Sequence, residues 1–419
     1  MLAVAIGCGG LSRTAPQSLD AAAERYVRLT LALAERDGDS LDSYHGPRAW
    51  QADARARHAS LADIKSEARA LAGTLAASTA AISVEDDERR LFLLRQLRAL
   101  AARVDILLGS RPGFAEEARS LFDFDAAAID GGDAVAIRAE VDRLLPGRGT
   151  VADRYAAFDR QFLVARDRID AVLSRAIEGC RGAASAHLTL PPGERVVVDY
   201  VGELPWSAFT RYEGRAVSRI RVNAALPLTV DRALDLACHE AYPGHHAIDT
   251  LLDARWPDRV EFLVRPLFSP QAMLHEAAAS LAPSLAFSDS GRLAFERDVL
   301  FPIAALDPAG ADLHVRVGRL VDRLAGAQAA VARQYLDGAL DFPRAAAALE
   351  HDALMPSADA TLKFLNQFRS YAATYTLGRE RLRRHLDATA GADQAARWRA
   401  FRDLVTSPAQ NLPPEPRHP

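Results

Sequence analysis

The residues best suited to chemistry in this chain lie within one octapeptide, His239-Glu240-Ala241-Tyr242-Pro243-Gly244-His245-His246. Three imidazoles and one carboxylate so close together are typical of a metal site. In the zinc-hydrolase signature H-E-x-x-H, two histidines one helical turn apart bind zinc, and the adjacent glutamate polarises the metal-bound water. Here Pro243 occupies the position of the second histidine.

A straight helix would not bring a later histidine to the same metal. His245 would lie about 120° off the face of His239 and about 9 Å along the axis, and His246 about 10.5 Å along it. Pro243 cannot donate to the helical ladder and Gly244 tolerates unusual dihedral angles, so the pair favours a widened turn. Two extra residues in that turn would make His245 the second ligand. His246 would need three, so we expect it to face the substrate or to support a ligand.

A catalytic zinc site needs a third protein ligand and an open position for water. The best candidate is Glu276, which we expect on a helix within residues 269–280. Small residues follow Glu276 on the next turn and would allow this helix to approach the histidine helix closely. The rival is Glu296, whose charged neighbours favour a solvated, ion-paired face.

The elements around these residues read as mainly helical. Residues 19–181 are rich in Ala, Leu, Arg and Glu with apolar residues at helical spacing, including a helix after a Ser83 cap and a run over residues 150–180. Residues 195–201 and 218–223 predict two short strands before the histidine helix, which we expect to start near Thr229. By analogy with zincins, Asn223 and the backbone of residues 220–225 are substrate-binding candidates; an ordinary sheet edge is the alternative.

Composition limits the partners. The chain has 419 residues, 49% of them hydrophobic, with a formal net charge of −4. This charge balance gives no footprint for nucleic acid, and no apolar run approaches the roughly 20 residues that span a bilayer. The three cysteines, Cys8, Cys180 and Cys238, are odd in number and widely spaced. That spacing argues against a disulfide framework and against a cysteine metal site, and we expect Cys238 to be a small packed residue.

The N-terminus and the Pro191-Pro192-Gly193 segment divide the chain. Residues 1–10 resemble the end of a bacterial lipoprotein signal with a lipid anchor at Cys8, which requires a translation start further upstream; a plain hydrophobic terminus is the alternative. We slightly favour the cell envelope over the cytoplasm. The expected organisation is a tail over residues 1–18, a helical half over 19–190 and a metal-site half over 191–419, which can form one continuous domain.

The block Asp235 to His246 resembles the bacterial family called domain of unknown function 885, which carries an H-E-x-x-P-G-H-H motif. That family also has a downstream glutamate, often within E-G-W-A; Glu276 matches it, although Ala277-Ala278-Ala279 replaces Gly-Trp-Ala. Residues 44–47, 300–302 and 368–378 look similar as well, so the resemblance covers nearly the whole chain. It implies a mainly α, zincin-like (gluzincin-like) metallohydrolase fold with a small β-sheet beside the cleft, and metallopeptidase chemistry.

These residues together predict a zinc-dependent hydrolase, most plausibly a peptidase. One Zn²⁺ per chain would be held by His239, His245 and Glu276, and Glu240 would act as general base and then as general acid. For stabilising the developing negative charge we expect Tyr375 first, with His246, Arg369 and Tyr371 as further polar candidates. Arg369 and Tyr371 are also substrate-binding candidates, or else part of a packed helix face. A non-catalytic scaffold with a structural site, and an amidase or esterase acting on a non-peptide substrate, are the alternatives.

Overall fold

The computed structural model describes residues 18–78, 83–126, 133–202, 204, 206–356 and 358–413. It is mainly α-helical, as the sequence predicted, and it has two small sheets where the sequence predicted one. The first eight helices are α1 (Leu19–Ala34), α2 (Arg48–Arg57), α3 (Leu61–Ala77), α4 (Val84–Leu107), α5 (Phe114–Phe122), α6 (Ala134–Leu144), α7 (Val151–Asp159) and α8 (Ile169–Ser185). The next are α9 (Val230–Glu240), α10 (His245–Arg255), α11 (Pro270–Ala286), α12 (Asp289–Phe295), α13 (Phe301–Ala304), α14 (Ala311–Asp322), α15 (Ala325–Leu336), α16 (Phe342–Asp352), α17 (Ala358–Phe368), α18 (Arg379–Ala390) and α19 (Gln394–Val405).

The strands form two separate sheets. The strands are β1 (Leu41–Tyr44), β2 (Arg195–Val201), β3 (Ala208–Gly214), β4 (Val217–Asn223) and β5 (Val264–Pro266). One sheet pairs β1 with β5, and the other has the order β2-β4-β3, with β2 parallel and β3 antiparallel to β4. The predicted strands β2 and β4 are present, whereas β3 was missed because its residues lack a clean apolar alternation.

Short turns of other helix types connect these elements. The 3₁₀ turns are η1 (Gly38–Ser40), η2 (Arg160–Phe162), η3 (Arg166–Arg168), η4 (Val260–Leu263), η6 (Pro308–Gly310) and η7 (Arg369–Tyr371), and the π-helical turns are η5 (Glu296–Leu300) and η8 (Thr374–Gly378). The turns η2 and η3 divide the run that the sequence predicted over residues 150–180 into α7 and α8. That prediction missed the interruption because the apolar spacing continues across it.

Capping residues begin the helices that matter most for the site. Ser269 accepts a hydrogen bond from the Ala272 backbone and is followed by Pro270, and this pair starts α11. Ser83 caps α4 in the same manner. Thr229 is the N-cap residue of α9, although its side chain makes no cap hydrogen bond.

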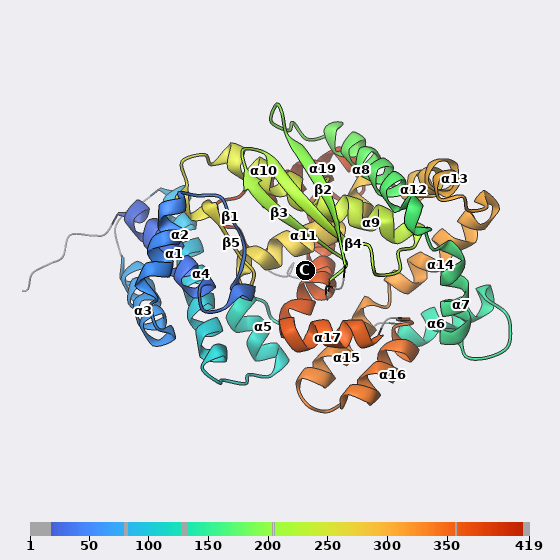
Figure 1. Cartoon of the computed structure of the whole chain (residues 1–419), viewed down its shortest axis with the longest axis horizontal. Helices are drawn as coiled ribbons and strands as arrows, with labels where there is room; N and C mark the ends of the chain where they lie inside the picture. Colours follow the sequence, from blue (N-terminus) through green and yellow to red (C-terminus); the bar gives the residue numbers. More distant parts are fainter. Residues whose placement is uncertain are drawn as a thin grey trace, which may run out of the picture.

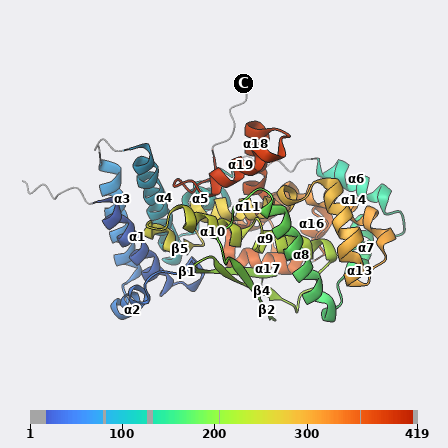
Figure 2. The same ribbon diagram turned by 90° about the horizontal axis from the view of Figure 1, so that it is seen from above.

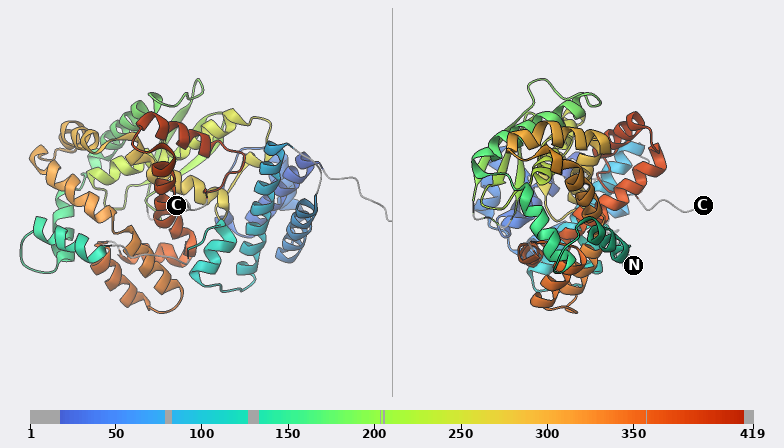
Figure 3. Two further views of the ribbon diagram at one scale, coloured as in Figure 1. Left: turned by 180° about the vertical axis from the view of Figure 1, so that it is seen from behind. Right: turned by 90° about the vertical axis from the view of Figure 1, so that its right-hand side faces the viewer.

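Helix α11 runs through the middle of the molecule (Figure 1). Helices α1 to α4 lie at one end, and α6, α7, α13 and α14 lie at the other; the view from above agrees (Figure 2). From behind, α18 and α19 cover α11 (Figure 3), and both contact it. The two largest apolar cores each combine residues from before and after residue 190. Residues from both the N-terminal and the C-terminal half of the chain therefore pack together, and the larger of the two cores includes α11.

Candidate metal centre

The histidine octapeptide forms a break between two helices. Helix α9 ends at Glu240 and α10 begins at His245, with a cis peptide bond between Tyr242 and Pro243. Two backbone hydrogen bonds span the break, from Gly244 N to the Cys238 oxygen and from Ala247 N to the Ala241 oxygen. Each reaches six residues back instead of four, so two residues are looped out of the helical ladder. This is the widened turn that the sequence predicted, taken far enough to separate the helices.

Gly244 is required by close approach of the backbone. A Cβ atom built at this position would lie 1.8 Å from the His239 carbonyl oxygen and 2.5 Å from that of Cys238. Any other residue would therefore push the start of α10 away from the end of α9. The glycine lets the two helices turn tightly enough for the first residue of α10 to face the last turn of α9.

The turn brings three predicted ligands together. His239 Nε2 and His245 Nε2 lie 3.2 Å apart, His239 Nε2 lies 3.4 Å from Glu276 Oε2, and His245 Nε2 lies 3.3 Å from Glu276 Oε1. Atoms bound tetrahedrally to zinc at about 2.0–2.1 Å are about 3.3–3.4 Å apart. The His239–His245 spacing and the distance from each histidine to one oxygen of the Glu276 carboxylate are close to this value, so the three side chains are close enough to share one ion. Among the residues that the structure describes, this is the one group of at least three His, Cys, Asp or Glu side chains close enough to hold a metal.

The pKa values in the triad also suit the binding of a cation. Burial lowers the pKa of His245, but the adjacent Glu276 carboxylate outweighs this and raises it to about 10. Burial raises the pKa of Glu276, but the two imidazoles outweigh this and hold it well below its ordinary value. Glu276 Oε2 is buried and has no hydrogen-bond partner. A zinc ion would satisfy that oxygen and both ring nitrogens at once.

Glu276 is oriented by a tyrosine. The Tyr371 hydroxyl donates to Glu276 Oε1 at 2.7 Å, which leaves Oε2 as the unpaired oxygen. Ala277, Ala278 and Ala279 are fully buried, in agreement with the predicted close approach of α11 to α9. The Tyr375 ring lies roughly parallel to the His239 ring, with 6.0 Å between the centroids. Tyr375 belongs to the π-helical turn η8, and such turns are frequent at functional sites.

Glu240 is the last residue of α9 and is 5% exposed. Thr210 of β3 donates to its Oε2 at 2.7 Å and lies 3.0 Å from its carbonyl oxygen. The carboxylate is close enough to raise the pKa values of His245 and Tyr375. Strand β3, which the sequence did not reveal, therefore holds the expected general base beside the triad.

His246 lies in a different environment from the one we expected. It is fully buried, with Nδ1 2.8 Å from Ser218 Oγ and Nε2 2.8 Å from Glu194 Oε2. Tyr242 and Arg181 also bind Glu194, and although burial raises the pKa of this carboxyl, the three partners together lower it to about 2. Both ring nitrogens are occupied, so His246 has no donor left for a substrate. It supports the fold around the turn instead of facing the cleft.

Two other expected substrate contacts have structural roles. Asn223 is 4% exposed, and its amide binds the carbonyl oxygens of Leu204 and Trp206 while accepting from the Ala225 backbone. Strand β4 lies between β2 and β3, so its backbone is already paired on both sides and cannot receive a peptide. Arg369 binds Glu117 of α5 and the Pro112 carbonyl. The sequence could not show these contacts. The partners of Arg369 lie about 250 positions earlier in the chain, and the carbonyl groups that bind the Asn223 amide lie in a loop that no sequence pattern predicted.

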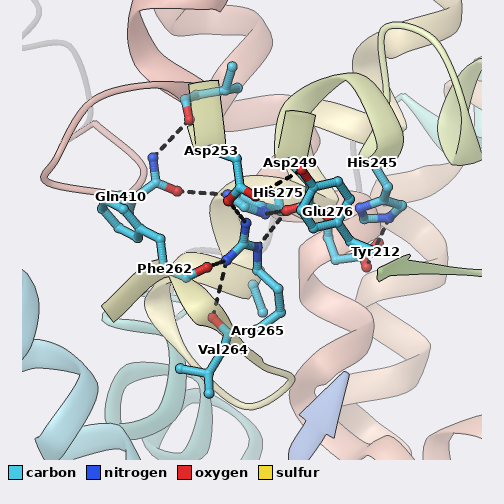
Figure 4. Close-up of polar contacts among 12 residues, drawn as sticks. Tyr212, His245, Asp249, Asp253, Phe262, Val264, Arg265, His275, Glu276 and Gln410 are labelled. Carbon is cyan, nitrogen blue, oxygen red and sulfur yellow. Dashed lines mark hydrogen bonds and ion pairs between the residues drawn. The ribbon is translucent and has the colours of Figure 1, made fainter. Parts of the chain in front are cut away.

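A buried ion-pair network supports the far side of the triad (Figure 4). Asp249 of α10, one turn after His245, pairs with Arg265 of β5 at 2.5 Å. His275 Nε2 donates to Gln410 Oε1 at 2.7 Å, and the ring points away from the metal ligands, as its position beside Glu276 predicts. Glu296, the rival third ligand, lies instead in an ion pair with Arg292 at 2.7 Å.

The structure also places Asp42 of β1 in the cavity beside His245 and Glu276. Burial, together with the carboxylates of Asp249, Glu276 and Glu240, raises the pKa of Asp42 to about 8, although His245 opposes them. This residue was missed because it lies about 200 positions upstream of the motif, and a single aspartate in a short strand carries no sequence signal.

Cys180 and Cys238 form a disulfide that the sequence analysis argued against. Both residues are fully buried, and the bond joins α8 to α9 immediately before His239. An odd number of cysteines does not exclude one disulfide, because the third cysteine, Cys8, is left over. Cys8 lies outside the described residues. The bond fixes the last turn of α9, which carries His239 and Glu240.

Comparisons with known proteins show that the chain resembles solved structures in its fold. Neither family models nor curated proteins match the chain. Among solved structures, the chain is similar to a candidate lipoprotein from Colwellia psychrerythraea, with a TM-score of 0.51 and 16% identity, over 83% of this chain and 67% of that one. A candidate lipoprotein of unknown function from Shewanella oneidensis has a TM-score of 0.47 and 14% identity, over 86% of this chain and 74% of that one. No helix in the described part of the chain is long and apolar enough to cross a membrane.

Proposed function

We propose that this protein is a zinc-dependent hydrolase, and specifically a peptidase of the family called domain of unknown function 885. The observation that carries the proposal is the convergence of His239 Nε2, His245 Nε2 and the unpaired Glu276 Oε2, with Glu240 beside them. A structural zinc site is usually closed by a fourth protein ligand. Here three ligands converge, which leaves a position open for water.

The protein residues divide the work of such a reaction. A bound zinc ion would polarise a water molecule and lower its pKa toward about 7. Glu240 is proposed to take the water's proton on Oε1, since Thr210 holds Oε2, and to return it to the leaving amine. Burial and the neighbouring carboxylates raise the pKa of Tyr375 well above its ordinary value, so its hydroxyl stays protonated and can donate to developing negative charge.

The cell envelope is the compartment that we propose for this activity. The Cys180–Cys238 disulfide supports it, because disulfides persist mainly in oxidising compartments such as the bacterial periplasm. The description of the Colwellia psychrerythraea structure as a candidate lipoprotein points the same way. A lipid anchor at Cys8 remains part of this proposal.

The test compares the wild type with Glu240→Gln, using metal analysis and digestion of a mixed peptide library. We expect one zinc per chain in both proteins, and a loss of cleavage of about 10²- to 10⁴-fold in the variant, as for removal of a general acid–base. Glu350→Gln on the exposed face of α16 is the matched control and should cleave like the wild type. Unchanged cleavage by the zinc-loaded variant would refute the role of Glu240.

Two further outcomes separate the alternatives. Cleavage of non-peptide amides or esters without cleavage of any peptide would show that the protein is an amidase or an esterase. A wild-type protein that holds zinc and hydrolyses none of these substrates would be a binding scaffold with a structural site.

A further inference from the structure

A cavity adjoins the metal triad on the side of the β1–β5 sheet. His245, Glu276 and Tyr371 form the wall that it shares with the triad, and Asp42 and Gln271 line its other side. Figure 4 shows the polar network at this end of the triad, in which Arg265 contacts both Asp249 and Asp253. A substrate bound at the metal would therefore have this cavity directly beside its reacting bond.

A β-bulge directs Asp42 toward the cavity. The β1–β5 register pairs Leu41 with Pro266 and then Ser43 with Arg265, so Asp42 is the extra, unpaired residue. Bulges commonly re-aim a side chain next to a site. The Asp42 carboxylate is half-buried and makes no hydrogen bond or ion pair with another side chain among the residues that the structure describes. Its placement costs free energy unless something in the cavity compensates it.

The buried amide of Gln271 is a second and independent indication that this cavity binds a polar ligand. It lies in the first turn of α11, is 1% exposed, and lines the same cavity as Asp42. Neither its amide nitrogen nor its amide oxygen has a hydrogen-bond partner. A buried amide with both ends unsatisfied is uncommon, because each unmade hydrogen bond costs about 1–3 kcal/mol. The amide can accept from a ligand through its oxygen and donate through its nitrogen.

The charges around the cavity determine what that ligand should be. Arg265 pairs with Asp249 at 2.5 Å and lies 3.6 Å from Asp253, so these two carboxylates compensate its positive charge. Glu276 is taken by the triad, and His275 is bound to Gln410. Among the carboxylates of the described residues that line the cavity, Asp42 is the one without an ion pair, since the nearby His245 is engaged by Glu276. The complementary ligand is therefore a cation that also donates hydrogen bonds.

We propose that Asp42 and Gln271 form a subsite that binds an ammonium group of the substrate next to the scissile bond. An ammonium has three donors, enough to reach the Asp42 carboxylate and the Gln271 oxygen together. Its source is either the free N-terminus of a peptide or a lysine side chain. This inference rests on the proposed peptidase function for the meaning of the scissile bond, whereas ammonium binding itself does not require turnover.

The test measures binding by calorimetry in zinc-loaded, full-length protein carrying Glu240→Gln, which prevents cleavage. Two pairs of probes differ only in the ammonium group. Trialaninamide is compared with its N-acetyl form, and acetyl-alanyl-lysyl-alaninamide is compared with its norleucine analogue. We expect one charged probe to bind at least about tenfold more tightly than its neutral match, and the pair that discriminates identifies the source of the ammonium.

Added substitutions locate the preference. Asp42→Asn should abolish it, whereas Asp39→Asn, three residues earlier and bound to Gln367, should keep it. Gln271→Met should weaken the preferred probe about fivefold through the loss of one hydrogen bond. All variants should retain zinc, because neither residue is a ligand. Gln271→Met also decides the question if Asp42→Asn fails to fold, as judged by its thermal melting.

The proposal is overturned if neither charged probe is preferred, if Asp42→Asn keeps the preference, or if Asp42→Asn loses the zinc. These outcomes are separate from failure of the proposed function. A preference that depends on Asp42, in a protein whose wild type cleaves nothing, would leave the subsite standing and refute the peptidase. Cleavage that depends on Glu240 without any charge preference would do the reverse.

Discussion

The neighbouring histidines His245 and His246 have opposite environments. His245 faces His239 and Glu276 with a ring nitrogen about as far from each as two ligands of one zinc ion are from each other. His246 is fully buried and satisfied by Ser218 and Glu194. Adjacent residues on a helix point about 100° apart, so one faces the cleft and the other faces β4 and the loop before β2.

The contrast teaches how a site differs from a structural network of the same residue types. Around His246, each polar atom of the ring has a partner, which makes the network a source of stability. Around His245, a buried Glu276 oxygen lacks a hydrogen-bond partner, and the carboxylate raises the pKa of the ring because it favours a positive charge there, which a bound cation would also supply. Unsatisfied polar atoms that converge are thus better evidence of function than the presence of histidines.

Removing His245 should have the largest effect. If the roughly 10–16 kcal/mol of a structural zinc site is shared by four ligands, each is worth about 2.5–4 kcal/mol, so His245→Ala should weaken zinc binding by about 10²- to 10³-fold. Hydrolysis should disappear with the metal. Competition with a chelating dye measures the affinity. Retention of full zinc affinity would show that the triad is not the metal site.

The disulfide should matter next, through stability. With a sequence separation of 58 residues, its loss in the double variant Cys180→Ala, Cys238→Ala should destabilise the protein by about 4 kcal/mol. Urea unfolding measures this change. Treatment of the wild type with a reductant should give a similar shift, whereas the double variant should not respond to it.

His246→Ala should lower stability and leave zinc in place. The substitution removes one of the partners that hold the buried Glu194, so we expect a loss of about 2–3 kcal/mol. Urea unfolding and metal analysis of the same sample test both parts. Loss of zinc without loss of stability would reverse the contrast between the two histidines.

Tyr371→Phe should weaken the metal site moderately. The hydroxyl orients Glu276 from outside the ligand set, and loss of such a partner typically costs 10- to 100-fold in metal affinity or activity. Tyr335→Phe, which removes the exposed hydrogen bond from Tyr335 to Asn366, is the control and should leave zinc affinity unchanged.

The last prediction concerns pH. Zinc binds neutral imidazole, whereas the His245 ring of the metal-free protein, with a pKa of about 10, is protonated near neutrality. Binding should therefore release about one proton, and the zinc affinity should rise about tenfold per pH unit until it levels off above pH 10. Glu276 adds no proton there because its pKa is low. Calorimetry in buffers of different ionisation enthalpy counts the proton. A pH-independent affinity would show that His245 is already neutral.

Local patterns predicted the elements well wherever the physical cause is local. The cap at Ser83, the strand at residues 218–223 and the turn at Pro243 and Gly244 all depend on neighbours within a few residues. Strand β3, the Asp42 bulge and the disulfide depend on partners far along the chain. Their residues have ordinary local composition, so no pattern revealed them.

The sequence by itself determined the ligand types, the spacing that excludes a straight helix, and the proline–glycine pair that resolves the conflict. Tertiary structure decided which side of α10 faces the cleft, and so which histidine meets Glu276 and which meets Glu194. It also brought Asp42 and Gln271 to one cavity. The reason is that a side chain's direction follows from local helix geometry, whereas the groups that it meets follow from the packing of distant segments.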